Sequence, residues 1–306
     1  MKTVLVILSF VFIIVFASCD TPRYAYSPTA HNVPIFTKQG DSKIAAYYST
    51  NGASSYSDDN GNEYDKATAH GADVQGAIAV TNNIALQGSY YIRSEGSTSN
   101  SNYSNFDNST IKYKRNMFEF GAGYFMAIDK KEHMLFQLYA GAGLGKATIK
   151  EKGTDFNQNY YTRFYNTNLT KFYLEPSLTF RTPKDIFAAT VATRASIIKF
   201  GKIRTDYTND EKLSLNLDSL DRYPVIFFEP SFVGSFGFPK APGFRVELQA
   251  GFSVLYQESF LDYRPFNFSL GLVFDIGKLI RGQKRIKIIH LKNCLIDQDK
   301  DYITVP

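Results

Sequence analysis

The feature that most limits how this chain can fold is a strict alternation of apolar and polar residues. It is clearest at residues 244–254, which read FRVELQAGFSV. A β-strand points successive side chains to opposite faces, so one face of this segment is apolar and the other carries charged groups. Similar segments recur along most of the chain, each long enough to cross a bilayer as a tilted strand. The pattern predicts an all-β fold, a closed antiparallel transmembrane β-barrel.

Connection lengths give the topology of this predicted barrel, which occupies residues 43–277. The predicted strands are residues 43–49, 71–80, 84–94, 112–128, 134–149, 169–181, 186–200, 223–238, 244–256 and 266–276. Short connections (81–83, 129–133, 182–185 and 239–243) alternate with long polar ones (50–70, 95–110, 150–168 and 201–222), and 257–265 is intermediate. Outer-membrane barrels have short periplasmic turns and longer extracellular loops. We therefore expect about ten strands, with both chain ends on the periplasmic side.

The charged residues of the alternating segments fix which face points inward. An Arg or Lys on the lipid-facing side at the bilayer midplane costs roughly 2–4 kcal/mol. The charged series is therefore predicted to face the lumen, as a network of Asp73, Arg93, Glu119, Lys171, Glu175, Arg181, Arg194, Glu229, Arg245 and Glu247. Small barrels are nearly filled by their own side chains. We predict a largely filled lumen, with a charged pore as the alternative.

Composition narrows the class of protein further. The hydrophobic content is 44% and the mean hydropathy is −0.23, which argues against a helical membrane protein. The argument does not apply to a barrel, because the polar residues that face its lumen lower the mean hydropathy of the chain. The net charge of +5 is modest and gives no reason to expect a nucleic-acid partner. The expected partner is the lipid bilayer of the outer membrane. We expect a monomer, and the sequence names no extracellular ligand.

The N-terminus has the pattern of a secretory signal. Lys2 precedes an apolar run at residues 4–16, and the following FASC at residues 16–19 resembles a bacterial lipobox. Residues 1–18 are therefore predicted to be a lipoprotein signal peptide with Cys19 as the acylated residue. An ordinary signal peptide is the alternative. If Cys19 is acylated, Cys294 is the only cysteine left with a free thiol, so no intramolecular disulfide is expected.

Two further segments flank the predicted barrel. Residues 19–42 lack periodicity and contain three prolines, and we interpret them as a lipid-anchored tether. Their apolar piece at residues 33–36 could tuck under the barrel or enter it as a plug. Residues 278–306 begin with a run of Lys and Arg without an acid as far as Lys292, and are predicted to form a basic periplasmic tail.

Two of the predicted strands share the sequence Glu-Pro-Ser, at residues 175–177 and 229–231. Proline has no N–H to donate to the ladder and normally sits at an edge or a bulge. Because a closed barrel has no free edge, we predict a local bulge or opened pairing at each proline.

No residue pattern indicates a cofactor, a metal site or a catalytic group. The four histidines are scattered, and no pair has metal-ligand spacing. His70 with Asp73 is the only pair that could act as a general base with an orienting acid. Residues 57–63 resemble the start of a Ca²⁺ loop, but the EF-hand spacing fails. We predict a non-enzymatic barrel with a structural or surface-binding role, and keep a small diffusion channel and a barrel-rim hydrolase as alternatives.

Three segments carry a resemblance to a known family. They are FASC at residues 16–19, SPTAHNVP at 27–34 and AIAVTNNIAL at 77–86. Together they resemble uncharacterised outer-membrane β-barrel lipoproteins of Bacteroidota. The resemblance implies an integral outer-membrane location and a lipid-anchored N-terminus. It assigns no catalytic residue.

Overall fold

The computed structural model describes residues 23–51, 56–57, 63–99, 109–154, 159–183, 186–239, 241–256 and 261–277. The predicted signal peptide, both cysteines, the basic tail and most of the Ca²⁺-like loop lie outside the described residues. Within them, no helix is long and apolar enough to cross a membrane.

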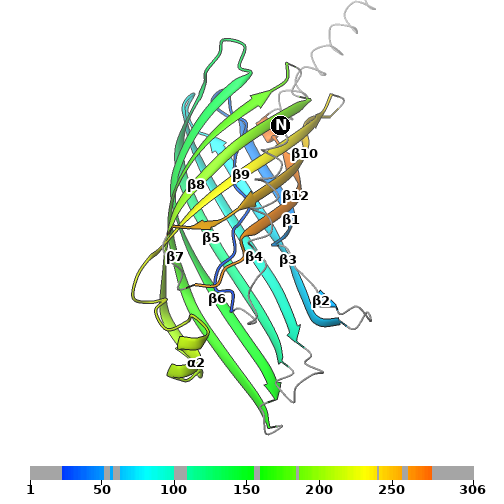
Figure 1. Cartoon of the computed structure of the whole chain (residues 1–306). Helices are drawn as coiled ribbons and strands as arrows, with labels where there is room; N and C mark the ends of the chain where they lie inside the picture. The colour runs from blue at the N-terminus through cyan, green and yellow to red at the C-terminus, as the bar shows by residue number, and fades with distance from the viewer. Residues whose placement is uncertain are drawn as a thin grey trace, which may run out of the picture.

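Ten long antiparallel strands form a closed barrel, which confirms the predicted fold class (Figure 1). The strands are β1 (Ser42–Thr50), β3 (Glu63–Ala79), β4 (Ile84–Ser99), β5 (Ser109–Ala127), β6 (Met134–Thr154), β7 (Tyr160–Arg181), β8 (Phe187–Thr205), β9 (Val225–Phe238), β10 (Ala241–Phe252) and β12 (Phe266–Phe274). Each strand pairs with its neighbours in sequence, and the sheet closes because β1 pairs with both β12 and β3. Two short strands, β2 (Tyr56–Ser57) and β11 (Val254–Leu255), extend the pairing of β3 and β9.

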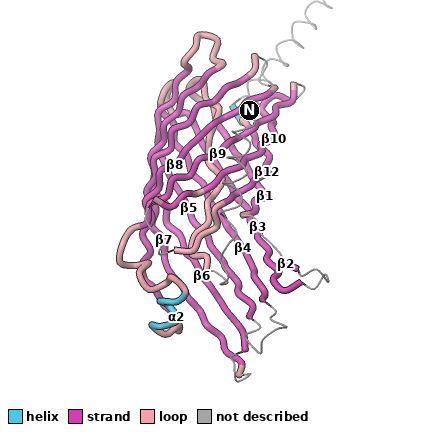
Figure 2. Tube along the Cα trace, viewed as in Figure 1, coloured by secondary structure: helices cyan, strands magenta, loops and turns pink. Residues whose placement is uncertain are grey.

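The strands reach further toward the long-loop end than the sequence pattern predicted. β3 begins at Glu63 instead of residue 71, β7 begins at Tyr160 instead of 169, and β8 continues to Thr205. The apolar and polar alternation stops where the sheet leaves the apolar belt, but the backbone ladder continues beyond it. The predicted long loops are therefore shorter than expected. One of them contains the short helix α2 (Asn209–Ser214), which lies at the same end (Figure 2).

The outer surface of the barrel is apolar and the interior is polar. Phe118, Phe172 and Phe232 point outward and are 51–58% exposed, whereas Lys171 and Glu175 on β7 are fully buried. A soluble barrel has the opposite arrangement. On β8 the outward series from Phe187 to Ile197 is apolar except for Thr193. Ten steps of about 3.3 Å, tilted by about 40°, give a belt about 25 Å tall, which matches a transmembrane barrel.

Both Glu-Pro-Ser segments open the ladder without changing its register. On β7, the assigned pairing with β8 passes from Leu174 to Ser177 and skips Pro176. On β9, the assigned pairing skips Pro230, since Gly251 pairs with Ser231 and the next partner is Val254 with Phe228. The predicted opened pairing is therefore present at each proline, and the predicted alternative of a bulge is not.

Residues 23–36 run through the inside of the barrel, and we call this segment the plug. Its Tyr26, His31, Val33 and Phe36 are each at most 3% exposed. At the short-turn end the plug leads into β1, since the Gly40 N–H donates to the Ala79 carbonyl at 2.9 Å. In Figure 1 the dark blue segment passes along the interior between the strands.

The start of the plug lies at the opposite end from the start of β1. The Arg23 guanidinium pairs with Glu151, near the long-loop end of β6, at 2.8 Å. Tyr26 forms an isolated bridge with Tyr263, in the connection between β11 and β12. Arg23, the first residue that the structure describes, therefore lies at the long-loop end, and not at the short-turn end where the sequence pattern leads us to expect the segment before the barrel. The segment has no period that could reveal this path, because its partners are spread over the whole wall.

Candidate functional site: the filled interior

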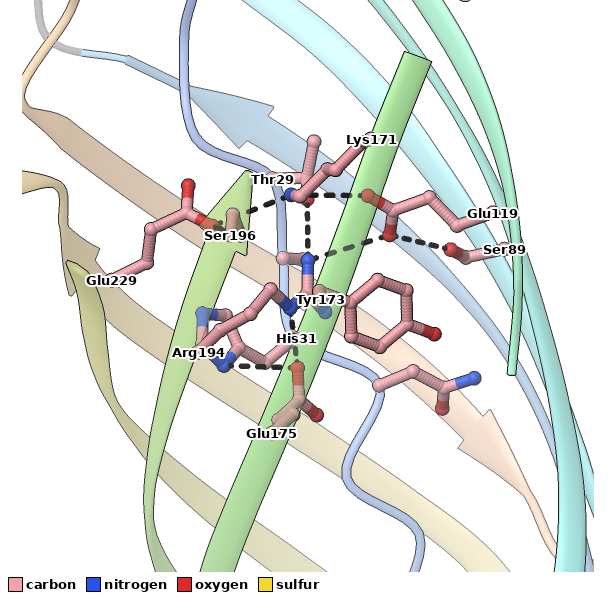
Figure 3. A network of polar contacts seen from close by, with 12 residues as sticks. Thr29, His31, Ser89, Glu119, Lys171, Tyr173, Glu175, Arg194, Ser196 and Glu229 are labelled. Atoms are coloured by element: carbon pink, nitrogen blue, oxygen red, sulfur yellow. Dashed lines mark hydrogen bonds and ion pairs between the residues drawn. The ribbon is translucent and has the colours of Figure 1, made fainter. Parts of the chain in front are cut away.

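Five charged side chains meet at the centre of the lumen (Figure 3). The Lys171 ammonium lies 3.1 Å from Glu119 and 3.3 Å from Glu229. The Arg194 guanidinium lies 2.5 Å from Glu175 and 3.3 Å from Glu119. All five are at most 2% exposed. We call this group the central cluster; its charges pair with one another across the interior instead of lining an open path.

The register of the strands brings the cluster together. Arg194 on β8 and Glu229 on β9 are direct cross-strand partners. Lys171, Tyr173 and Glu175 alternate along β7 and so share its inner face. Room for the Tyr173 ring comes from Gly121 and Gly141 of β5 and β6, since a Cβ at either would lie 2.5 Å from the Tyr173 hydroxyl.

The plug contributes three side chains to the central cluster. The Tyr26 hydroxyl donates to Glu229 at 2.6 Å and accepts from Lys171 at 3.2 Å. Thr29 Oγ1 accepts from Arg194 at 3.2 Å. His31 Nδ1 lies 3.4 Å from Glu175. Figure 3 shows Thr29 and His31 on the chain segment that passes through the middle of the barrel.

The cluster contains three carboxylates, a lysine and an arginine. Glu119 contacts both cations, and Glu229 combines Lys171 with hydroxyl donors from Tyr26, Ser196 and Ser253. Glu175 has Arg194 as its cation and the imidazole of His31 beside it. Since a buried unpaired charge is expensive, Glu175 is the carboxylate whose charge the cluster needs least.

The other predicted lumen residues form smaller groups around this centre. Arg93 pairs with Asp73 at 2.8 Å. Glu247 accepts from Lys43 at 3.3 Å and Tyr47 at 2.5 Å, and Arg245 donates to the Ser235 hydroxyl at 2.7 Å. Arg181 lies at the short-turn end, where it pairs with Glu132 of the turn at 2.8 Å. It therefore braces that turn, away from the central cluster.

Sequence reasoning missed a second charged group near the long-loop end. Glu95 on β4 pairs with Arg115 on β5 and, at 3.0 Å, with Arg264. Glu95 has the same odd parity along β4 as Arg93, and Arg115 the same parity along β5 as Glu119. Parity alone could have found them. Glu95 lies in residues 95–110, which the sequence pattern predicts to be a loop, whereas Arg115 lies within the predicted strand 112–128, where parity assigns it to the lumen.

The plug and the long-loop end meet in a third group. The Glu151 carboxylate accepts from Arg23, from Tyr161 at 3.0 Å and from Tyr207 at 2.6 Å. Burial, together with this bond to Glu151, raises the pKa of the Tyr207 hydroxyl well above its ordinary value, so it stays a donor. Arg264 lies over the ring of Tyr24 at 3.9 Å. The long-loop end of the plug is therefore held by an ion pair and a cation–π contact, in addition to the contacts at its middle.

The candidate general-base pair is not assembled. His70 points outward and is exposed, whereas Asp73 is buried in the lumen and paired with Arg93. Three residues of spacing on one strand put the two side chains on opposite faces. In the part of the chain that the structure describes, no group of three or more His, Cys, Asp or Glu could hold a metal ion.

No family model matches this chain, and no curated protein matches it in sequence. Solved structures match it as barrels. The translocator domain of the autotransporter NalP from Neisseria meningitidis has a TM-score of 0.48 at 9% identity, covering 77% of this chain and 88% of that one. The outer membrane protease OmpT from Escherichia coli has 0.41 at 10%, covering 78% and 98%. OprG from Pseudomonas aeruginosa has 0.32 at 11%, covering 79% and 99%. The likeness concerns the barrel architecture alone, and the resemblance to lipoproteins of Bacteroidota stays a prediction.

Proposed function

We propose that this protein is an integral outer-membrane barrel closed by its own plug, with a structural or surface-binding role exerted at its extracellular end. The observation that carries the proposal is the occupied lumen. Tyr26, Thr29 and His31 bind the central cluster from the inside, and Asn32 donates to the Gly76 carbonyl on β3 at 3.0 Å. A conducting barrel of this size needs that space for water. The closed interior therefore supports a non-conducting barrel. Its action as a monomer belongs to the same proposal and does not depend on the closed interior.

Bilayer conductance tests this proposal against the diffusion channel. The wild-type protein, reconstituted in planar bilayers, is expected to give no large stable currents. A variant with residues 24–35 replaced by a Gly/Ser segment of equal length is expected to conduct intermittently, since Gly/Ser chains behave as flexible coils. Stable wild-type currents comparable with those of the variant would reject the filled lumen.

We also propose that Cys19 is acylated and that its acyl chains enter the outer leaflet. Chain connectivity supports this placement. Four residue steps of at most about 3.6 Å separate Cys19 from Arg23, which limits the distance to about 14 Å. Arg23 is bound to Glu151 at the long-loop end, which is the extracellular end in a barrel of this topology. This proposal replaces the periplasmic position of the N-terminal end expected from the sequence.

Palmitate labelling and surface labelling test the two parts separately. Incorporation of labelled palmitate should be lost in Cys19→Ser. A short epitope inserted between Asp20 and Thr21 should bind antibody on intact cells, and the same epitope in the turn at residues 129–133 should bind only after permeabilisation. An epitope at residue 20 that stays hidden until permeabilisation would contradict the threaded path.

A further inference from the structure

A groove of about 590 Å³ lies on the long-loop half of β5–β8. Its lining includes Lys146 on β6, Lys199 and Lys202 on β8, the polar Asn116 and Asn168, and the apolar Leu144. The three lysines are exposed, and no carboxylate contributes to the lining. The groove is therefore cationic on one side and apolar at its edge.

The groove lies at the boundary of the apolar belt. On β8 the outward series ends its apolar run at Ile197 and continues with Lys199. On β6 the last apolar outward residue is Leu144, which is 69% exposed, and the next is Lys146. With a belt about 25 Å tall, these lysines are level with the lipid headgroups of the leaflet on the long-loop side.

A β-bulge turns one of the lysines into the groove. Asn168 pairs with Gly201 and Asn166 with Arg204, so Lys202 and Ile203 together face Thr167. Bulges of this kind re-aim side chains. The extra residue makes Lys202 exposed, where strict alternation from Lys199 would turn it inward, and lets Ile203 pack against the core.

The bulge also holds Lys202 in a strained conformation. Its φ is 51°, in the left-handed region that a residue with a side chain rarely adopts. Strain of this kind persists only where the surrounding structure imposes it, and it often marks a functional position. Glycine would fit the site without strain, yet the chain carries a lysine there.

Further cations extend the positive field beyond the groove. Lys112, Lys114, Lys150, Lys152 and Arg204 are exposed on the same outward face. Anionic headgroups are attracted to such basic surfaces. The three groove lysines differ from these five because they lie at the belt edge, where a lipid's phosphate and its acyl chain can be contacted together.

We propose that this groove binds the phosphate headgroup of one lipid of the outer leaflet. Lys146, Lys199 and Lys202 neutralise the phosphate, Asn116 and Asn168 supply amide donors, and Leu144 contacts the acyl chain. The inference rests on the proposed outer-membrane location. The test of the groove measures lipid preference. Heat-modifiable migration in detergent gels measures membrane insertion separately, so failure of one proposal can be distinguished from failure of the other.

The test uses a matched pair of lipids, phosphatidic acid and diacylglycerol, which differ only in the phosphate. Binding of each to the full-length protein in detergent is followed by native mass spectrometry. The wild-type protein should bind phosphatidic acid at least tenfold more tightly than diacylglycerol. The triple variant Lys146→Gln, Lys199→Gln and Lys202→Gln should lose this preference. The control triple Lys112→Gln, Lys150→Gln and Lys152→Gln removes the same charge on the same face and should keep it.

Two further measurements separate the remaining interpretations. Inorganic phosphate at the same concentration should not displace phosphatidic acid, because it lacks the acyl chain that contacts Leu144. Lys202→Gly keeps the bulge without its strain, so it should fold normally and still weaken phosphatidic acid binding severalfold. Equal binding of the two lipids, an equal loss in both triple variants, or displacement by free phosphate would overturn the proposal.

Discussion

The Tyr26 hydroxyl donates a 2.6 Å hydrogen bond to Glu229, and this contact ties the plug to the wall of the barrel at β9. Tyr26 is fully buried and its ring stacks on Phe227 with 4.6 Å between the centroids. A residue that precedes the first strand is thus part of the central cluster. The plug and the wall therefore form one packed interior.

Removing only the Tyr26 hydroxyl should destabilise the folded barrel. Tyr26→Phe keeps the ring but takes one donor from a buried carboxylate, which costs about 1–3 kcal/mol. Ser196, Ser253 and Lys171 still contact Glu229, so we expect the lower half of that range. Denaturant unfolding, followed by heat-modifiable gel migration, measures the difference. The control Tyr160→Phe changes a side chain that is 91% exposed and should have no effect. An equal loss of stability in both variants would mean that the Tyr26–Glu229 hydrogen bond does not stabilise the barrel.

The central cluster should respond very differently to the loss of a cation and the loss of one acid. Lys171→Met leaves Glu119 and Glu229 short of a buried partner, which should cost about 3–5 kcal/mol. Glu175→Gln removes the charge of the third carboxylate in a cluster with two cations, and it should cost less than about 1 kcal/mol. Unfolding free energies of both variants, measured in the same detergent, test the difference. Similar losses of unfolding free energy in the two variants would mean that the number of cations does not limit the stability of the cluster.

The lipid-facing side of the belt should reject a charge. Phe232 points outward on β9 and is 51% exposed, and Val191 on β8 and Ala250 on β10 are its cross-strand partners. Phe232→Lys places an ammonium in lipid and should lower the unfolding free energy by about 2–4 kcal/mol. Phe232→Leu is the control and should change it little. A neutral effect of Phe232→Lys would mean that this face meets water.

The helix α2 should lose stability locally in acid. Partial burial of the Glu211 carboxyl alone would raise its pKa. Hydrogen bonds from Thr208 and Arg163 outweigh this effect and hold the pKa of Glu211 below its ordinary value. A carboxyl with a lowered pKa stabilises the folded form above its unfolded pKa, and this contribution is lost as the pH falls through the folded value. The protection factors of the α2 amides, which are corrected for the intrinsic exchange rate at each pH, should therefore fall below about pH 4.

The capping box explains why this effect should be local. Thr208 accepts from the Glu211 N–H at 3.2 Å, and Glu211 accepts from the Thr208 N–H at 2.6 Å. Thr208→Ala should lower the local stability of α2 by about 1 kcal/mol. Hydrogen exchange at neutral pH measures this loss as faster exchange of the α2 amides. The exchange of β7 serves as the internal reference. An acid effect of the same size in both segments would point to global unfolding instead.

The barrel could be predicted from the sequence because each membrane strand shows its alternation of apolar and polar residues within a short segment. Glu175, Glu229, Arg245 and Glu247 each alternate with apolar neighbours, so strand, face and register follow from a few residues. The interior position of these four side chains needs no long-range information. Strand ends were less predictable, because polar residues such as those of 160–168 continue the ladder after the alternation has ended.

The plug could not be predicted in the same way. Its contacts join residues more than a hundred positions apart, such as Tyr26 with Glu229 and Arg23 with Glu151. The segment has no period, and its prolines were equally compatible with an outside tether. Only residues 33–36 signalled a buried position, through their apolar composition. The direction of threading depends on which end of the wall Arg23 meets, and no local pattern encodes that.

Photo-crosslinking from the plug tests whether residues 23–36 occupy the lumen of the barrel in the membrane. His31 exchanges hydrogen bonds with Gln249 of β10, at 2.9 Å in both directions, and lies beside Glu175 of β7. A benzophenone amino acid introduced at position 31 and irradiated in intact membranes should crosslink within the same chain, to peptides of β7–β10. Crosslinks to other proteins or to lipid, without crosslinks to these strands, would show that residues 23–36 lie outside the lumen.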